Sequence, residues 1–204
     1  MYTPSHYRID DPGAARSFIE RHSFGTMISY ADSFHVTHLP FVPGGDGPLT
    51  LSSHMARANP HWRCFADNPE VLVIFQGPHA YISPALYEEW VSVPTWNYAV
   101  VHVYGRVKLD DDVEAVLEKM IRAFDADYLT RWLTLPEEYK SKLKKGIVGF
   151  EVEVERIEAK FKMHQKSSKT DRQRIIEEFG RSGDTTLAGV AEYMQWSLLS
   201  EGEA

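Results

Sequence analysis

Apolar and polar residues alternate along several short stretches of the chain, a period-two pattern typical of β-strands with one buried face. The clearest case is Gly146–Glu155, whose acidic residues fall on one face and apolar residues on the other, and a continuation to Lys162 fits the pattern. Val71–Phe75 is instead continuously apolar, which favours a strand buried on both faces. Further strands are predicted at Phe24–Tyr30, His35–Val42, Leu49–Ser53, His79–Ser83 and Tyr98–Leu109.

Helical spacing and capping residues predict helices between and after these strands. Asp11 and Pro12 suit the cap and the first position of a first helix. Asp110–Asp112 caps a helix with Val113, Val116, Leu117, Met120 and Phe124 on one face. Further helices are predicted from about Arg57 to Asp67, from Pro136, over Lys169–Gly180 and over Thr185–Gln195.

The order of elements predicts a mainly β protein with helices, in the α+β class. Turn residues at Gly44–Pro48 favour a meander in which Leu49–Ser53 pairs with the strand before it, and Gly77-Pro78 predicts a second turn. Gly105 inside a strand indicates a bulge or a bend. A strand and a helix do not alternate throughout, so a small barrel with helices fits better than a doubly wound sheet.

Length and composition limit the class of protein. The 204 residues, 43% of them hydrophobic, suffice for one domain or one domain with an appendage. Cys64 is the single cysteine, which suits a reducing compartment, and it is expected to act as a small buried apolar residue. No secretion signal and no apolar run of roughly 20 residues is found. We therefore expect a cytoplasmic protein that does not enter a membrane.

The net charge of −7 argues against general binding to nucleic acid, because contacts with phosphate dominate that affinity. One basic run breaks this pattern, and we interpret it either as a site for an anion or as compensation for the acidic strand at Glu151–Glu158. The predicted helix Thr185–Gln195 follows Lys169–Gly180 at helix-turn-helix spacing but carries no Lys or Arg, which argues against a recognition helix. The basic run consists of Lys160, Lys162, Lys166, Lys169, Arg172 and Arg174.

The segment Ser53–Trp62 carries the strongest chemical signal. It is predicted to join a strand end to a helix start, where free amide groups favour anions, and Arg57 adds a fork suited to phosphate. A capped helix with a solvated Arg57 explains the same spacing equally well. A second segment, Pro94–Tyr98, places Trp96 and Asn97 before a strand, where an indole can cover a flat ring and an amide can bind its edge, or where the Trp can fill the barrel end.

Other chemistries find less support in the sequence. His35 and His38 lie three apart on one strand and so face opposite sides, and no H-x-H or C-x-x-C spacing for a metal is present. No G-x-G-x-x-G loop, Walker A loop or G-x-S-x-G elbow occurs. A hydrolase and the common nucleotide-binding folds are therefore disfavoured, and no metal is expected.

Four ordered motifs resemble the PaiB-like family of FMN-binding negative transcriptional regulators, over about residues 1–194. One departure is Lys166, which stands where an Asn is expected in the basic motif that begins at Lys162. The four motifs are His38–Phe41, His54–Trp62, Phe75–Pro84 and Val93–Tyr98.

The resemblance implies a split β-barrel of the FMN-binding type that forms a homodimer, with FMN near the subunit interface. The expected boundaries are 1–164 for the barrel and 165–204 for a C-terminal helical appendage. The phosphate would be held at Ser53–Asn59, with Arg57 as its main partner, and the ring would lie along Thr37 and His38. The implied cofactor-binding residues are Thr37, His38, Ser53, His54, Met55, Arg57, Ala58, Asn59, Trp96 and Asn97.

The function implied is repression of sporulation and protease genes by a mechanism based on binding, with DNA as a further partner to consider. Catalytic residues are not identified. Two alternatives stay open: a flavin reductase or oxidase whose chemistry the cofactor supplies, and a haem-binding split barrel that uses one of the nine histidines.

Overall fold

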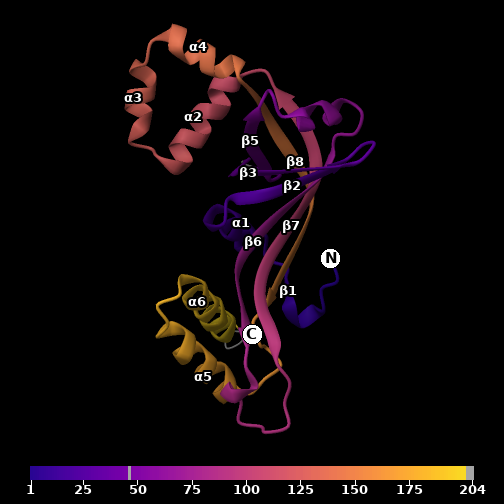
Figure 1. Cartoon of the computed structure of the whole chain (residues 1–204), viewed down its shortest axis with the longest axis vertical. Helices are drawn as coiled ribbons and strands as arrows, with labels where there is room; N and C mark the ends of the chain where they lie inside the picture. Colours follow the sequence, from indigo (N-terminus) through magenta and orange to yellow (C-terminus); the bar gives the residue numbers. More distant parts are fainter. Residues whose placement is uncertain (46, 201–204) are drawn as a thin grey trace. The chain divides into compact units, whose positions relative to one another are not determined.

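The computed structural model describes residues 1–45 and 47–200, and these form an antiparallel sheet with helices (Figure 1). Asp46, in the predicted turn Gly44–Pro48, and the last four positions of the predicted appendage lie outside the described residues. The chain divides into two compact units: unit 1 contains residues 1–15, 76–101 and 158–204, and unit 2 contains residues 16–75 and 102–157.

The strands follow the order β3-β2-β6-β7-β8-β5-β4 in one sheet, and β1 pairs with β8. In β2 every second residue is buried, as the sequence pattern predicts: Gly25, Met27 and Ser29 are buried, while Phe24 and Tyr30 are exposed. The strands are β1 (Arg8–Ile9), β2 (Phe24–Tyr30), β3 (Phe34–Pro40), β4 (Val42–Gly44), β5 (Thr50–Ala56), β6 (Glu70–Ile82), β7 (Thr95–Asp110) and β8 (Ile147–Lys162).

Helices lie between and after the strands. Asp112 caps α2 by accepting from the Ala115 amide at 3.0 Å, as its sequence position predicts. The α-helices are α1 (Pro12–Arg21), α2 (Val113–Phe124), α3 (Tyr128–Thr134), α4 (Glu137–Lys145), α5 (Lys169–Gly180) and α6 (Thr185–Ser200). Short 3-10 helices are η1 (Ser5–Tyr7), η2 (Pro60–Ala66) and η3 (Pro84–Leu86).

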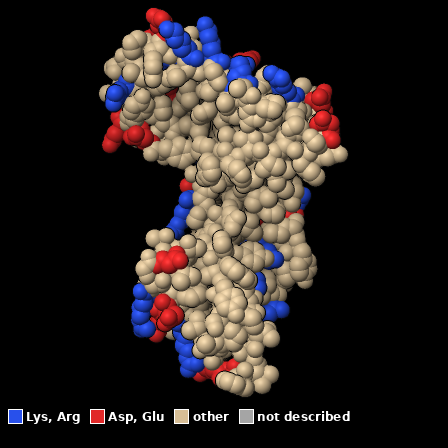
Figure 2. All heavy atoms as spheres, viewed as in Figure 1, with Lys and Arg blue, Asp and Glu red and all other residues tan. Residues whose placement is uncertain are grey.

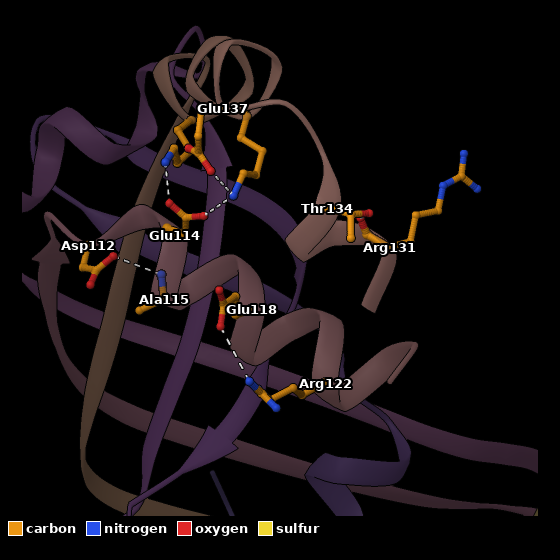
Figure 3. A network of polar contacts seen from close by, with 10 residues as sticks. Asp112, Glu114, Ala115, Glu118, Arg122, Arg131, Thr134 and Glu137 are labelled. Carbon is orange, nitrogen blue, oxygen red and sulfur yellow. Dashed lines mark hydrogen bonds and ion pairs between the residues drawn. The ribbon is translucent and has the colours of Figure 1, made fainter. Parts of the chain in front are cut away.

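Helices α2 to α4 form an insertion between β7 and β8 that is tied together by charge pairs (Figure 3). Glu114 on α2 accepts from Lys140 at 3.0 Å and from Lys144 at 2.5 Å, both on α4. The Lys140 ammonium also pairs with Glu137 and lies 5.8 Å from the centre of the Trp132 ring. One carboxylate thus links the first helix of the insertion to the last.

The core of unit 2 is built from the inward-facing residues of its strands. Phe41 is fully buried between Phe75 and Phe150, with ring centroids 5.6 and 6.4 Å away. In unit 1, Phe161 of β8 packs on Tyr193 and on Trp196 of α6 at 5.3 and 5.6 Å. Burial of these aromatic groups holds the strands and helices of each unit together.

One predicted strand pairing and one predicted turn were wrong. Strand β5 pairs with β4 and β8 and does not continue a meander from β3, because the strand predicted over His35–Val42 ends at Pro40 and a separate strand, β4, begins at Val42. The predicted turn after it is present, and Gly45 there has a φ of +89°. The sequence Gly77-Pro78 does not turn the chain, since β6 runs from Glu70 to Ile82. Here the alternation of buried residues shifts by one position between Gly77 and Ala80, so these residues change the phase of the strand instead of ending it.

The predicted helix from about Arg57 to Asp67 was right only in part. Strand β5 continues to Ala56. A turn follows in which the backbone amide of Asn59 donates to the Ala56 carbonyl at 2.9 Å, and the helical part of the segment is the 3-10 helix η2. Asn59 caps η2, and Pro60 suits its first position. Helix α3 had no counterpart among the predicted elements.

Candidate functional site

Arg57 lies at the end of β5 as a fixed fork. Its Nε donates to the Lys145 carbonyl at 3.0 Å and its Nη2 donates to the Ile147 carbonyl at 2.8 Å. Its backbone amide donates to the Gly146 carbonyl at 2.8 Å, and the Trp62 indole donates back to the Arg57 carbonyl at 3.0 Å. The guanidinium is exposed and keeps further N–H groups at Nη1 and Nη2, so it can bind an anion without losing these contacts.

The predicted role of helix amides in this segment does not match the local structure. Arg57 precedes η2, which is a short 3-10 helix, and the Asn59 side chain already accepts from the His61 amide at 3.0 Å. Ala58 is exposed in the same turn. A guanidinium held by two main-chain carbonyls therefore replaces the predicted strand-to-helix anion site.

Residues Ser53 to Met55 alternate along β5 and do not meet at one place. Ser53 is fully buried and donates to the Pro40 carbonyl at 2.7 Å, and Met55 is also buried. His54 faces the other side, where its Nδ1 lies 3.0 Å from Sδ of Met120 in α2, and burial lowers its pKa. Strand geometry requires this separation, since successive side chains point to opposite faces.

A hydrogen-bonded chain of polar side chains joins β2, β3 and η2 inside unit 2. Asn59 Nδ2 donates to Thr37 Oγ1 at 3.1 Å, and Thr37 Oγ1 lies 2.7 Å from His61 Nδ1. His61 Nε2 in turn lies 2.6 Å from Ser29 Oγ. Thr37 and Asn59 are half-buried, whereas His61 and Ser29 are 2% and 3% exposed, so the chain runs from an accessible end to a closed one.

The buried imidazole of His61 is held in the neutral form. Burial, assisted by the neighbouring His35 ring at 5.7 Å between centroids, lowers the pKa of His61 to about 4. The centroid of the Phe65 ring lies 5.4 Å from that of His61. At neutral pH this residue therefore acts only through hydrogen bonds.

His38 lies on the opposite face of β3 from this chain, as the spacing predicts. It is exposed, its Nδ1 lies 3.0 Å from Thr26 Oγ1, and its ring stacks with Phe24 at 6.4 Å. Thr37 and His38 thus present different faces of one strand.

Trp96 and Asn97 belong to unit 1. Trp96 is 52% exposed and lies beside His79 and Tyr81, at 5.8 and 6.3 Å between ring centroids. Asn97 is fully buried; its Nδ2 lies 3.3 Å from Sδ of Met194, and its Oδ1 has no hydrogen-bond partner among residues 1–45 and 47–200. The accessible group for a flat ring is therefore the Trp96 indole.

His61 was missed by the sequence prediction, although it lies inside a motif that was noticed. The signal was available in Asn59-Pro60-His61, because an Asn cap followed by Pro turns the third residue back toward the cap. Its partners Ser29 and Thr37 are 32 and 24 positions away and cannot be inferred from spacing.

The basic run has mostly internal partners. Arg172 is 1% exposed and donates to Ser197 at 3.2 Å, Lys160 donates to the Tyr2 carbonyl at 3.0 Å, and Arg174 pairs with Glu88. The acidic strand finds other cations, since Glu151 pairs with Lys119. Most of this run therefore supports unit 1 and does not form an open anion site.

The structure also bears on metal binding, on membrane spans and on the single cysteine. Across the described ranges, no group of three or more His, Cys, Asp or Glu residues could hold a metal ion. None of the helices described is long and apolar enough to cross a membrane. The thiol of Cys64 is buried, and this burial raises its pKa.

The residues of unit 2 fit a phosphorylated flat ligand. Arg57 keeps N–H groups for a phosphate, and half-buried Thr37 and Asn59 keep hydrogen-bonding capacity for a ring edge. Arg57 and Asn59 lie in one turn, so a single short segment offers both functions.

Comparison with known proteins agrees with this chemistry. Residues 1–156 match the family described as "Putative FMN-binding domain". The chain is 36% identical over 206 residues to Protease synthase and sporulation protein PAI 2 of Bacillus subtilis, covering 97% of this chain and 98% of that protein.

Solved structures show the same fold at low identity. The FAD and haem binding protein from Mycobacterium smegmatis matches with a TM-score of 0.58 at 13% identity, over 76% of this chain and 73% of that one. The flavocytochrome Anf3 from Azotobacter vinelandii matches with a TM-score of 0.50 at 12% identity, over 76% and 69%.

Proposed function

Because the chain belongs to the PaiB-like family of proteins with an FMN-binding domain and has its split-barrel fold, we propose that it binds FMN and acts as a homodimeric regulator of protease and sporulation genes. FMN supplies redox chemistry when bound. The chain's own contribution in this proposal is to bind and orient the cofactor.

The guanidinium of Arg57, held in place as a fork, is the feature that best supports FMN binding. Two main-chain carbonyls hold the guanidinium at 3.0 and 2.8 Å, so little side-chain entropy is lost when it binds a phosphate. A charge-assisted hydrogen bond from a guanidinium to a phosphate is also stronger than a hydrogen bond between neutral groups. Thr37 and Asn59 would bind the ring.

The homodimer is supported by an apolar outer face on β2 and β3. Register places Tyr30 opposite Phe34, and Ile28 opposite Val36, on the same side of the two strands. Phe34 is 74% exposed and Val36 is 54% exposed. A contiguous group of exposed apolar side chains favours contact with another protein, and we propose a second copy of this chain as that partner.

DNA is the further partner that the proposed regulator would act on, directly or through another protein. On the face in Figure 2, Lys and Arg are interspersed with Asp and Glu. Together with the net charge of −7, this pattern favours control through another protein over broad contact with the DNA backbone.

The experiment for the site is an FMN titration of Arg57→Ala, followed by the quenching of flavin fluorescence. Loss of a charged hydrogen bond should weaken binding by about 1.5–3 kcal/mol. Arg57→Lys keeps the charge without the fork and should fall between the wild type and Arg57→Ala.

Arg63→Ala is the matched control for that titration. The Arg63 guanidinium lies 5.6 Å from the same Trp62 ring, against 5.9 Å for Arg57, and it is not among the proposed cofactor contacts. Arg63→Ala should keep the wild-type affinity. Equal affinity of a folded Arg57→Ala protein and the wild type would refute the phosphate role.

A further inference from the structure

The direction of the polar chain follows from its closed end. Ser29 is 3% exposed, and its hydroxyl lies 2.6 Å from His61 Nε2. A buried hydroxyl hydrogen without an acceptor is costly, and Nε2 is the acceptor that the structure offers it. Ser29 therefore donates to His61 Nε2, and in a neutral imidazole the proton then resides on Nδ1.

The orientation of the side-chain amide of Asn59 is fixed by a contact that does not involve Ser29. Its Oδ1 accepts from the His61 amide at 3.0 Å, so the group 3.1 Å from Thr37 Oγ1 is the NH2. Thr37 Oγ1 thus accepts one hydrogen bond from Asn59 and one from His61 Nδ1, which uses both lone pairs of the hydroxyl.

Two donors then remain at the accessible end. The Thr37 hydroxyl hydrogen cannot point back at the two groups that donate to it, and the Asn59 NH2 keeps its second hydrogen. Both residues are half-buried, and their donor atoms are 3.1 Å apart. With the other tautomer of His61, Thr37 would present an acceptor instead.

We propose that His61 is a positioning residue that makes Thr37 a hydrogen-bond donor, so that Thr37 and Asn59 form a two-donor pair for a carbonyl oxygen of the flavin ring. This inference rests on the proposed function. His61 does not touch the cofactor, and it acts by donating from Nδ1 to the Thr37 oxygen. The pair selects ligands with an acceptor at that edge of the ring.

Two substitutions of His61 separate positioning from packing. In His61→Asn, the amide nitrogen takes the place of Nδ1 and can still donate to Thr37, whereas His61→Gln reaches only toward Ser29. The full-length protein should bind FMN with an affinity within about threefold of the wild type in His61→Asn and about tenfold more weakly in His61→Gln. Thr37→Val should resemble His61→Gln, and Thr37→Ser should resemble the wild type.

Nitrogen NMR of the protein without FMN reads the tautomer directly and does not depend on the variants folding. The expected spectrum has a protonated Nδ1 and a bare Nε2 for His61 at about pH 7. A protonated Nε2 would overturn the inference.

The titrations also distinguish the two proposals. If the wild-type protein binds FMN and His61→Asn and His61→Gln bind it with the same affinity as each other, the inference is overturned and the proposed function stays intact. A wild-type protein that does not bind FMN overturns the proposed function, and the flavin part of this inference with it.

Discussion

At the scale of single residues, the segment around Arg57 shows how tertiary contacts assign roles that spacing leaves open. Two explanations of Arg57 were equally consistent with the sequence, and both assumed a helix. The carbonyls of Lys145 and Ile147, about 90 positions further along, instead hold it as a fixed fork. The motif could identify the residue, but only the pairing of β5 with β8 could define its geometry.

Stability against pH tests the buried state of His61. Its pKa falls from 6.5 to about 4 on folding, so unfolded chains take up the proton first as the pH drops. The contribution of neutral, buried His61 to the free energy of unfolding amounts to about 3 kcal/mol. This contribution is complete above about pH 6.5 and is lost as the pH decreases toward about 4. Urea unfolding of the wild type and of His61→Asn at several pH values measures it.

The variant should lose less stability than the wild type over that interval, since Asn does not titrate. Parallel curves for the two proteins would show that the His61 imidazole titrates equally in the folded and unfolded states. The buried chain described above would then be wrong.

At the scale of elements, the close approach of β7 and β8 depends on one glycine. A Cβ on Gly105 would lie 2.2 Å from the Glu153 carbonyl oxygen, a backbone atom that cannot move away cheaply. Gly105→Ala should therefore destabilise unit 2 by about 1–3 kcal/mol, as overpacking does. Thermal unfolding measures this effect.

Gly183→Ala is the matched control, because a Cβ at Gly183 has no atom within 4 Å. It should unfold at about the wild-type temperature. Two variants with the same melting temperature would contradict the tight packing of β7 on β8.

Most elements could be predicted from local pattern, and the errors have a common cause. Strand β2 and helix α5 have the predicted bounds, because alternation and capping act within a few residues. The pairing of β5, the continuity of β6 and the short η2 depend on partners that are distant in sequence. The motifs at Thr37 and Asn59 were visible, but the hydrogen bonds that link them through His61 were not.

At the scale of the whole molecule, the proposed homodimer places the apolar face of β2 and β3 at an interface. Val36→Lys adds a charge to that face and should shift the protein toward monomers, as measured by light scattering after gel filtration. Leu133→Lys is the control, since Leu133 in α3 is similarly exposed, at 55% against 54% for Val36. A Val36→Lys protein that stays dimeric would place the interface elsewhere.

Retention of the cofactor after desalting tests whether this chain holds FMN. The purified full-length protein is incubated with FMN at micromolar concentration, desalted, and examined by visible spectroscopy. We predict that flavin bands remain with the protein, and that Arg57→Ala retains less flavin than Arg63→Ala. A spectrum without flavin bands after desalting would contradict the account, and a Soret band from the isolated protein would favour the haem-binding alternative.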